Sequence, residues 1–173
     1  MNKNLIFIGL LSILSFYNCN SGWQQQTNIE ESVNTFQSIS EEDISKIQYT
    51  EYILDRQTNL TIEQWQKHDE LQRIIANNKI ADFSFFIDNK DVLLAFLKDL
   101  KETTPERINT PAIQARLIAL ETVFLKFEDQ LMRANATKGE LLEVVKELLV
   151  SFSNLNLQIN KKFEKETQNI QKP

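Results

Sequence analysis

Apolar residues recur every three to four positions along the C-terminal part of the chain and form two long seams. The first seam comprises Ile113, Leu117, Leu120, Phe124, Phe127 and Leu131, and the second comprises Leu141, Val145, Leu148, Phe152, Leu155 and Ile159. This spacing keeps each set on one face of a helix, so it predicts helices at residues 111–134 and 138–168. The short link at residues 134–136 predicts that the two helices form an antiparallel hairpin within a larger bundle.

Less regular apolar spacing predicts three further helices, at residues 41–57, 62–78 and 80–102, the last with a break near Asp88. Four of the five expected helix starts carry a capping residue: Ser40, Thr61 with Gln64, Thr110 with Pro111, and Thr137 with Glu140. Ile39 and Ile44 are spaced as a hydrophobic staple around the first start.

Glycine is almost absent from the rest of the chain, because Gly139 is the only glycine after Gly22. The frequent turns of a β-sandwich or barrel are therefore missing. The sequence predicts an all-α fold, a single helical bundle of four to five helices over residues 40–168, followed by a frayed tail at 169–173.

The N-terminus has the layout of a secretory signal, because Lys3 precedes the apolar stretch 5–16 and the polar sequence that follows. That stretch is shorter than the ~20 residues that a helix needs to cross a bilayer. It therefore predicts a signal peptide at residues 1–18 that is removed. The only cysteine of the chain, Cys19, follows directly.

Residues 11–22, LSILSFYNCNSG, resemble the lipobox of bacterial lipoproteins. The resemblance implies that Cys19 is acylated and becomes the first residue of the mature protein. Residues 19–39 then form a polar, flexible tether to the membrane. We expect a lipid-anchored protein of the bacterial cell envelope, in the outer membrane, with the periplasmic or surface face left open.

Charge and residue usage narrow the function classes. The chain has a net charge of −5 and no run of lysine or arginine, which argues against nucleic acid as a partner. Beyond Cys19 there is no thiol for a disulfide, and His68 is the only histidine, so we expect neither a transition-metal site nor another cofactor. His68 shares a helix face with apolar residues, which favours a packed histidine over a general base.

No nucleophile motif or glycine-rich phosphate loop occurs in the sequence, so no catalytic residues are predicted. The acidic groups at 41–43 and 128–129 could act as paired carboxylates. The first group suits a helix N-terminus and the second suits a solvated helix face, which explains both without chemistry. A hydrolase that uses carboxylates is the remaining enzymatic alternative.

The segment around residue 85 is the main candidate for binding, because it concentrates large apolar residues in a short span. The predicted patch comprises Phe83, Phe85, Phe86 and Ile87. If some of these side chains are exposed, they offer a surface to another protein or to an apolar ligand. The alternative is a locally broken helix that plugs the end of the bundle.

Residues 60–64, LTIEQ, match the pattern L-T-x-x-Q. They resemble the helix-start signature of small helical periplasmic chaperones and stress sensors, which implies a cradle-shaped dimer that holds unfolded clients. A periplasmic chaperone is therefore the alternative to a protein- or ligand-binding module. The seams can be satisfied within one chain or between two, so the oligomeric state stays open.

Overall fold

The computed structural model describes residues 38–87 and 90–168. The predicted signal peptide, Cys19, nearly all of the tether and the tail at 169–173 lie outside these residues. The helices are α3 (Glu41–Ser45), α4 (Arg56–Thr61), α5 (Gln66–Lys79), α6 (Ser84–Ile87), α7 (Lys90–Glu102), the 3-10 turn η1 (Glu106–Ile108), α8 (Pro111–Leu131) and α9 (Lys138–Thr167). No β-strand occurs in the described residues, and the all-α class is confirmed.

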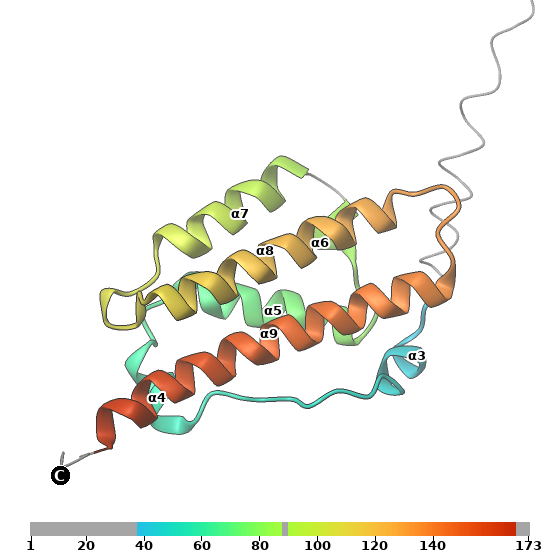
Figure 1. Ribbon diagram of the computed structural model, residues 1–173. Helices are drawn as coiled ribbons and strands as arrows, with labels where there is room; N and C mark the ends of the chain where they lie inside the picture. The colour runs from blue at the N-terminus through green and yellow to red at the C-terminus, as the bar shows by residue number, and fades with distance from the viewer. Residues whose placement is uncertain (1–37, 88–89, 169–173) are drawn as a thin grey trace, which may run out of the picture.

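The two longest helices, α8 and α9, lie side by side as the predicted antiparallel hairpin (Figure 1). Every residue of the two apolar seams is buried. The helix starts are also confirmed, because the Thr110 hydroxyl accepts the Ile113 N–H and Thr137 forms a reciprocal capping box with Glu140. The buried apolar seams and the N-terminal caps therefore identify the same two helices.

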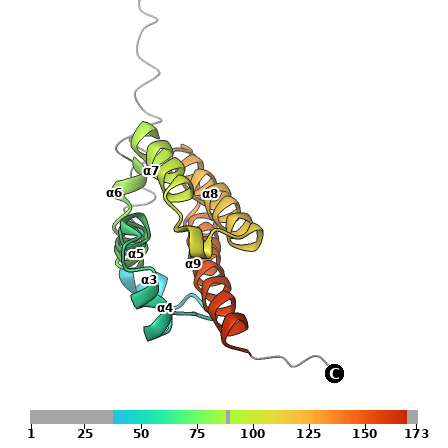
Figure 2. The same cartoon turned by 90° about the vertical axis from the view of Figure 1, so that its left-hand side faces the viewer.

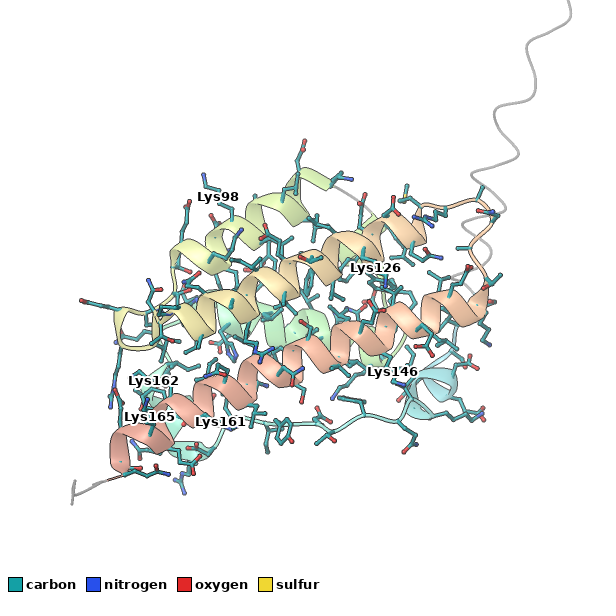
Figure 3. The ribbon with its side chains drawn as sticks, viewed as in Figure 1. Lys98, Lys126, Lys146, Lys161, Lys162 and Lys165 are labelled. Carbon is teal, nitrogen blue, oxygen red and sulfur yellow. The ribbon has the colours of Figure 1, made fainter. Side chains whose placement is uncertain are left out.

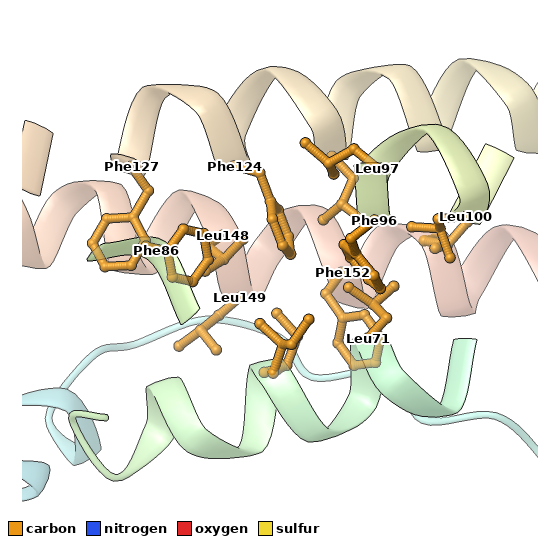
Figure 4. Close-up of a cluster of buried hydrophobic side chains, with 14 of the residues drawn as sticks. Leu71, Phe86, Phe96, Leu97, Leu100, Phe124, Phe127, Leu148, Leu149 and Phe152 are labelled. Carbon is orange, nitrogen blue, oxygen red and sulfur yellow. The ribbon is translucent and has the colours of Figure 1, made fainter. Parts of the chain in front are cut away.

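Helices α5, α6 and α7 cover the hairpin, with α5 and α6 opposite α9 when the molecule is viewed along the bundle (Figure 2). Their apolar side chains meet those of α8 and α9 in one core (Figure 4). Aromatic rings form its centre: the Phe86 ring lies 5.2 Å from that of Phe124 and 4.7 Å from that of Phe127. Such tilted ring pairs contribute stabilisation beyond the burial of their area.

The predicted helix at 41–57 is wrong. Its N-terminal cap forms as expected at Ser40, and the staple residues Ile39 and Ile44 are buried, but α3 ends at Ser45. Residues 46–55, which we call the strap, then run without helical structure along α9 to α4 (Figure 1). The strap contains the sequence IQYTEYIL, rich in isoleucine, tyrosine and threonine, and these residues favour extended backbone over helix.

The helix start predicted at Thr61 is also wrong. Thr61 is the last residue of α4, and its hydroxyl donates to the Gln57 carbonyl at 2.8 Å. Helix α5 begins at Gln66 after Trp65, which provides no side-chain cap. Trp65 is instead buried and donates from its indole to Thr103 at 3.3 Å. Packing of the indole therefore fixes this helix start, and residues 60–64 do not carry a capping box.

The segment predicted as a helix from 80 to 102 is divided more than expected. Helix α5 ends at Lys79, and Ala81 adopts the left-handed conformation with φ 62°. The Asp82 N–H then bonds the Asn77 carbonyl at 2.9 Å, as in a Schellman motif. Within the segment 80–102, the described helices are α6 and α7. The expected break near Asp88 lies at residues that the structure does not describe.

Candidate functional site

The phenylalanine-rich segment divides between the core and the surface. Phe83 and Phe86 are 3% and 2% exposed, and both rings pack against Phe127. These two residues therefore cannot contribute to a surface patch, because the aromatic core already surrounds them. Phe85 and Ile87 remain partly exposed. Of the predicted patch, only Phe85 and Ile87 can contact a partner. Phe83 and Phe86 fit the alternative, in which the segment closes the end of the bundle.

The exposed side of Phe85 borders an open groove of about 470 Å³ between α5 and the start of α6 and α7. The groove is lined by Glu70, Arg73, Ile74, Asn77, Ser84, Phe85 and Val92. Ile74 is buried and Val92 is 53% exposed, so apolar surface continues from the core to the rim. An apolar floor with a few polar groups around it is the usual composition of a binding site.

The two charged side chains that line the groove, Glu70 and Arg73, differ in whether they form an ion pair. Glu70 is paired with Lys67 at 2.9 Å, and this ion pair raises the pKa of the Lys67 ammonium. Arg73 is exposed and forms no ion pair within the described part of the chain. The rim therefore keeps one cationic donor beside the apolar floor. Arginine donors in such a place can bind a carboxylate with two parallel hydrogen bonds.

A second arrangement of polar groups lies where the strap crosses α9. Ser153, Asn156 and Asn160 share one face of the helix and bond the main chain of the strap. The Ser153 hydroxyl accepts from Tyr52 N–H at 2.6 Å and donates to the Thr50 carbonyl at 2.9 Å. Asn156 donates to the Tyr52 carbonyl at 3.1 Å, and Asn160 donates to the Ile53 carbonyl at 2.7 Å. We call these three side chains the α9 ladder.

The α9 ladder replaces the β-partner that an extended segment normally requires. Buried main-chain groups must find hydrogen-bond partners, and side chains supply them here. Asn160 also accepts the Asp55 N–H at 3.1 Å, next to the point where Asp55 caps α4. At the opposite end, Lys138 pairs with Asp43 at 2.8 Å and keeps the pKa of the Asp43 carboxyl far below its usual range. The strap is therefore bonded to α9 over residues 50–55, and α3, which precedes the strap, is paired with the start of α9.

His68 is 1% exposed, so its side chain packs inside the core. Its Nε2 lies 3.3 Å from Asn156 Oδ1, and its Nδ1 lies 3.5 Å from Gln72 Nε2. Because Asn156 donates its amide to Tyr52, its oxygen accepts, which assigns the proton of a neutral imidazole to Nε2. Burial lowers the pKa of His68, which stacks on the Trp65 ring at 5.3 Å.

This environment does not resemble that of a general base. Both hydrogen-bonding neighbours of His68 are amides, and the adjacent Asp69 is exposed. A catalytic histidine is ordinarily oriented by a third polar group and reaches a site where substrate can bind. His68 instead joins α5 to the α9 ladder.

The two acidic groups considered for catalysis are engaged in a helix cap and in ion pairs. In the first group, Asp43 caps the helix start and Glu42 pairs with Lys46 at 2.7 Å. In the second, the solvated face expected from the sequence is wrong for Glu128, which is 7% exposed and pairs with Lys90 of α7 at 2.9 Å. Its neighbour Asp129 pairs with Arg133 at 2.7 Å. No group of histidine, cysteine and carboxylate side chains within the described residues could hold a metal ion. No helix in the same part of the chain is long and apolar enough to cross a membrane.

The lysines labelled in Figure 3 lie on three helices, with Lys98 on α7, Lys126 on α8 and the others, Lys146 among them, on α9. Three of them, Lys161, Lys162 and Lys165, lie near the C-terminal end of α9. Lys162 is paired there with Glu166, which also lies 3.6 Å from Arg107. The local excess of positive charge is therefore partly neutralised.

Sequence analysis anticipated Phe85 but not the other residues of the groove. Arg73 and Asn77 lie one turn apart on an ordinary polar helix face, which gives no signal by itself. The α9 ladder did leave a signal, since Ser153 and Asn156 interrupt an otherwise apolar stripe and are 2% and 3% exposed. Searches against protein-family models, curated proteins and solved structures return no match.

Proposed function

We propose that this protein is a lipid-anchored module of the bacterial envelope that binds a partner without catalysis. The lipobox-like sequence that ends in Cys19 supports the anchor. The groove beside Phe85 supports the binding role, and it is the observation on which the proposal depends. The tether carries the bundle at some distance from the membrane surface, where the groove meets a partner protein.

The chemistry of the groove indicates what it binds. Ile74, Phe85 and Val92 offer apolar surface to a large apolar side chain of the partner. Arg73 stands at the rim, where it pairs with an acidic residue next to that side chain. Apolar anchors in a pocket, flanked by polar contacts, typically supply most of the affinity of a protein interface. The partner is therefore expected to present an apolar residue beside a carboxylate.

Photocrosslinking in cells tests the groove. A photoreactive residue is introduced at Val92, and a matched control carries it at Ile118 on α8, because the two side chains are 53% and 55% exposed. Ile118 does not line the groove. We expect one discrete adduct from position 92, lost with Arg73→Glu, and none from position 118. The same adducts from both positions, or none from either, would contradict the binding role.

A separate experiment tests the anchor and the compartment. Cys19→Ala is expected to abolish incorporation of labelled palmitate and to release the protein from the membrane fraction. Protease treatment of intact cells then shows whether the anchored bundle faces outward or inward. Palmitate incorporation that is unchanged in Cys19→Ala would refute the anchor and leave the groove untouched.

The chaperone alternative predicts a different behaviour. A chaperone slows the aggregation of an unfolded client, whereas a module with one specific partner does not. Light scattering of a denatured client protein, with and without the folded bundle, separates the two. Suppression that survives Phe85→Ala and Arg73→Glu would favour the chaperone reading over recognition by the groove.

A further inference from the structure

The strap has the composition of a β-strand but no strand beside it. Its central sequence IQYTEYIL consists mainly of residues that favour extended backbone. One edge is occupied, because the α9 ladder bonds both main-chain groups of Tyr52. The described part of the chain contains no strand that could occupy the other edge. In Figure 1 the strap forms the lower margin of the molecule.

Alternation of the backbone defines the open edge. In an extended chain, both main-chain groups of a residue point to one edge, and those of its neighbours point to the other. Both groups of Tyr52 face α9, so those of Glu51 point away from it. The alternation ends at the next residue, because the Ile53 carbonyl also bonds Asn160 of α9. Neither the N–H nor the carbonyl of Glu51 forms a hydrogen bond within the described residues. Residues 50–53 are all exposed, with Ile53 at 74%.

We propose that the open edge of the strap binds an extended segment of another polypeptide by strand addition. Main-chain hydrogen bonds at Glu51 hold the segment, and the exposed side chains of Tyr52 and Ile53 select it. This mode of recognition needs an edge that is already extended, which the α9 ladder provides. The edge is distinct from the groove at Phe85, so the inference does not rest on the function proposed above.

The charge of the strap decides between a second copy and a different partner. Pairing two straps antiparallel about Glu51 would place two carboxylates opposite each other, which is unfavourable. A segment with a basic residue opposite Glu51 forms an attractive charge pair at the position where a second copy of the strap would place a repelling carboxylate. Glu51 is already paired with Lys79, but it remains exposed to a neighbouring strand. The partner segment therefore carries lysine or arginine at its centre, with β-branched or aromatic residues on either side.

Three synthetic peptides serve as probes. The first, IQYTKYILD, has the sequence of residues 47–55 with Glu51→Lys; the second keeps the glutamate. The third is the lysine peptide with N-methyl groups on alternate residues, which removes the main-chain donors. Fluorescence anisotropy gives the affinity of each peptide for the folded protein. Hydrogen exchange measured by mass spectrometry reports on the strap.

We expect the lysine peptide to slow exchange at residues 49–53, the glutamate peptide to bind about fivefold more weakly, and the methylated peptide not to bind. Glu51→Lys in the protein should reverse the preference for the first two peptides. Glu41→Lys, at an exposed glutamate of α3, should leave it unchanged. Unchanged strap exchange with every peptide would refute strand addition. Faster strap exchange would also refute it, since the peptide would then have displaced the strap from α9.

Discussion

Asn160→Ala tests how strongly the α9 ladder holds the strap. The mutation removes two hydrogen bonds, one to the Ile53 carbonyl at 2.7 Å and one from the Asp55 N–H at 3.1 Å. A typical intramolecular hydrogen bond contributes about 0.5–1.5 kcal/mol. Water can reach the partly exposed Asn160 and partly replace the lost bonds. The bonds should therefore contribute about 1–2 kcal/mol together.

Alanine also changes the intrinsic stability of the helix, so the mutation needs a matched control. Asn154 lies on the same helix, is partly exposed, and forms no side-chain hydrogen bond within the described residues. Asn154→Ala should stabilise the protein by about 0.5 kcal/mol, through helix propensity alone. The same gain applies to Asn160→Ala, so the difference between the two variants isolates the bonds to the strap.

Urea unfolding followed by circular dichroism provides the free energy of each variant. Hydrogen exchange at residues 50–55 adds a local measurement, because the strap can open without unfolding the bundle. We expect Asn160→Ala to be about 1–2 kcal/mol less stable than Asn154→Ala, and its strap to exchange faster. Equal stability and equal exchange in the two variants would show that the ladder does not hold the strap.

Three further predictions concern the core, the turn after α5 and pH. Phe86→Ala should cost about 3–5 kcal/mol in urea unfolding, and Phe85→Ala clearly less, because only the first ring is fully buried; equal costs would contradict this division. Ala81→Gly should raise the free energy of unfolding by about 0.5–1 kcal/mol by relieving the left-handed alanine, and a loss would refute the strain. Burial lowers the pKa of His68 below 6.5, so stability is complete above pH 6.5 and falls at lower pH, by at most about 1.4 kcal/mol per pH unit. Unfolding at pH 7.5, 6.5 and 5.5 checks this, and His68→Gln should remove the slope.

The C-terminal hairpin could be predicted because two local signals agreed. Apolar spacing selected the buried face, and Thr110 and Thr137 marked the helix starts through side-chain bonds that span only three residues. Such information lies within a short stretch of sequence and does not depend on distant elements. The structure differs from these predictions by a few residues at most, chiefly at the end of α8.

The N-terminal third was harder to predict, because distant contacts decide its structure. The L-T-x-x-Q pattern fits a capping box, but Trp65 is buried and its indole bonds Thr103 just after α7, and the helix starts beyond the pattern. Helix α3, which precedes the strap, has a good cap at Ser40, and this cap misled the assignment of the residues beyond α3. Tertiary packing commonly overrides local preferences of this size.

The groove was only partly predictable for a similar reason. The sequence pointed to the segment around Phe85, and four large apolar residues in five positions could not all be buried on one helix face. Which of them face the core depends on Phe124 and Phe127, about 40 residues later in the chain. Arg73 joins the site only because α5 packs against α7, which also contacts α6, and a single exposed arginine carries no such information.

Polar residues inside an apolar stripe were the strongest signal that sequence analysis did not use. The face of α9 that carries Leu149 and Phe152 continues through Ser153, Asn156 and Asn160. Placing hydroxyl and amide groups there costs stability unless each finds a hydrogen-bond partner. Main chain that lacks both helical and sheet partners can provide such groups. The spacing of three and four residues therefore encodes an extended segment along α9, and the strand-forming sequence at 47–54 is the segment that matches it.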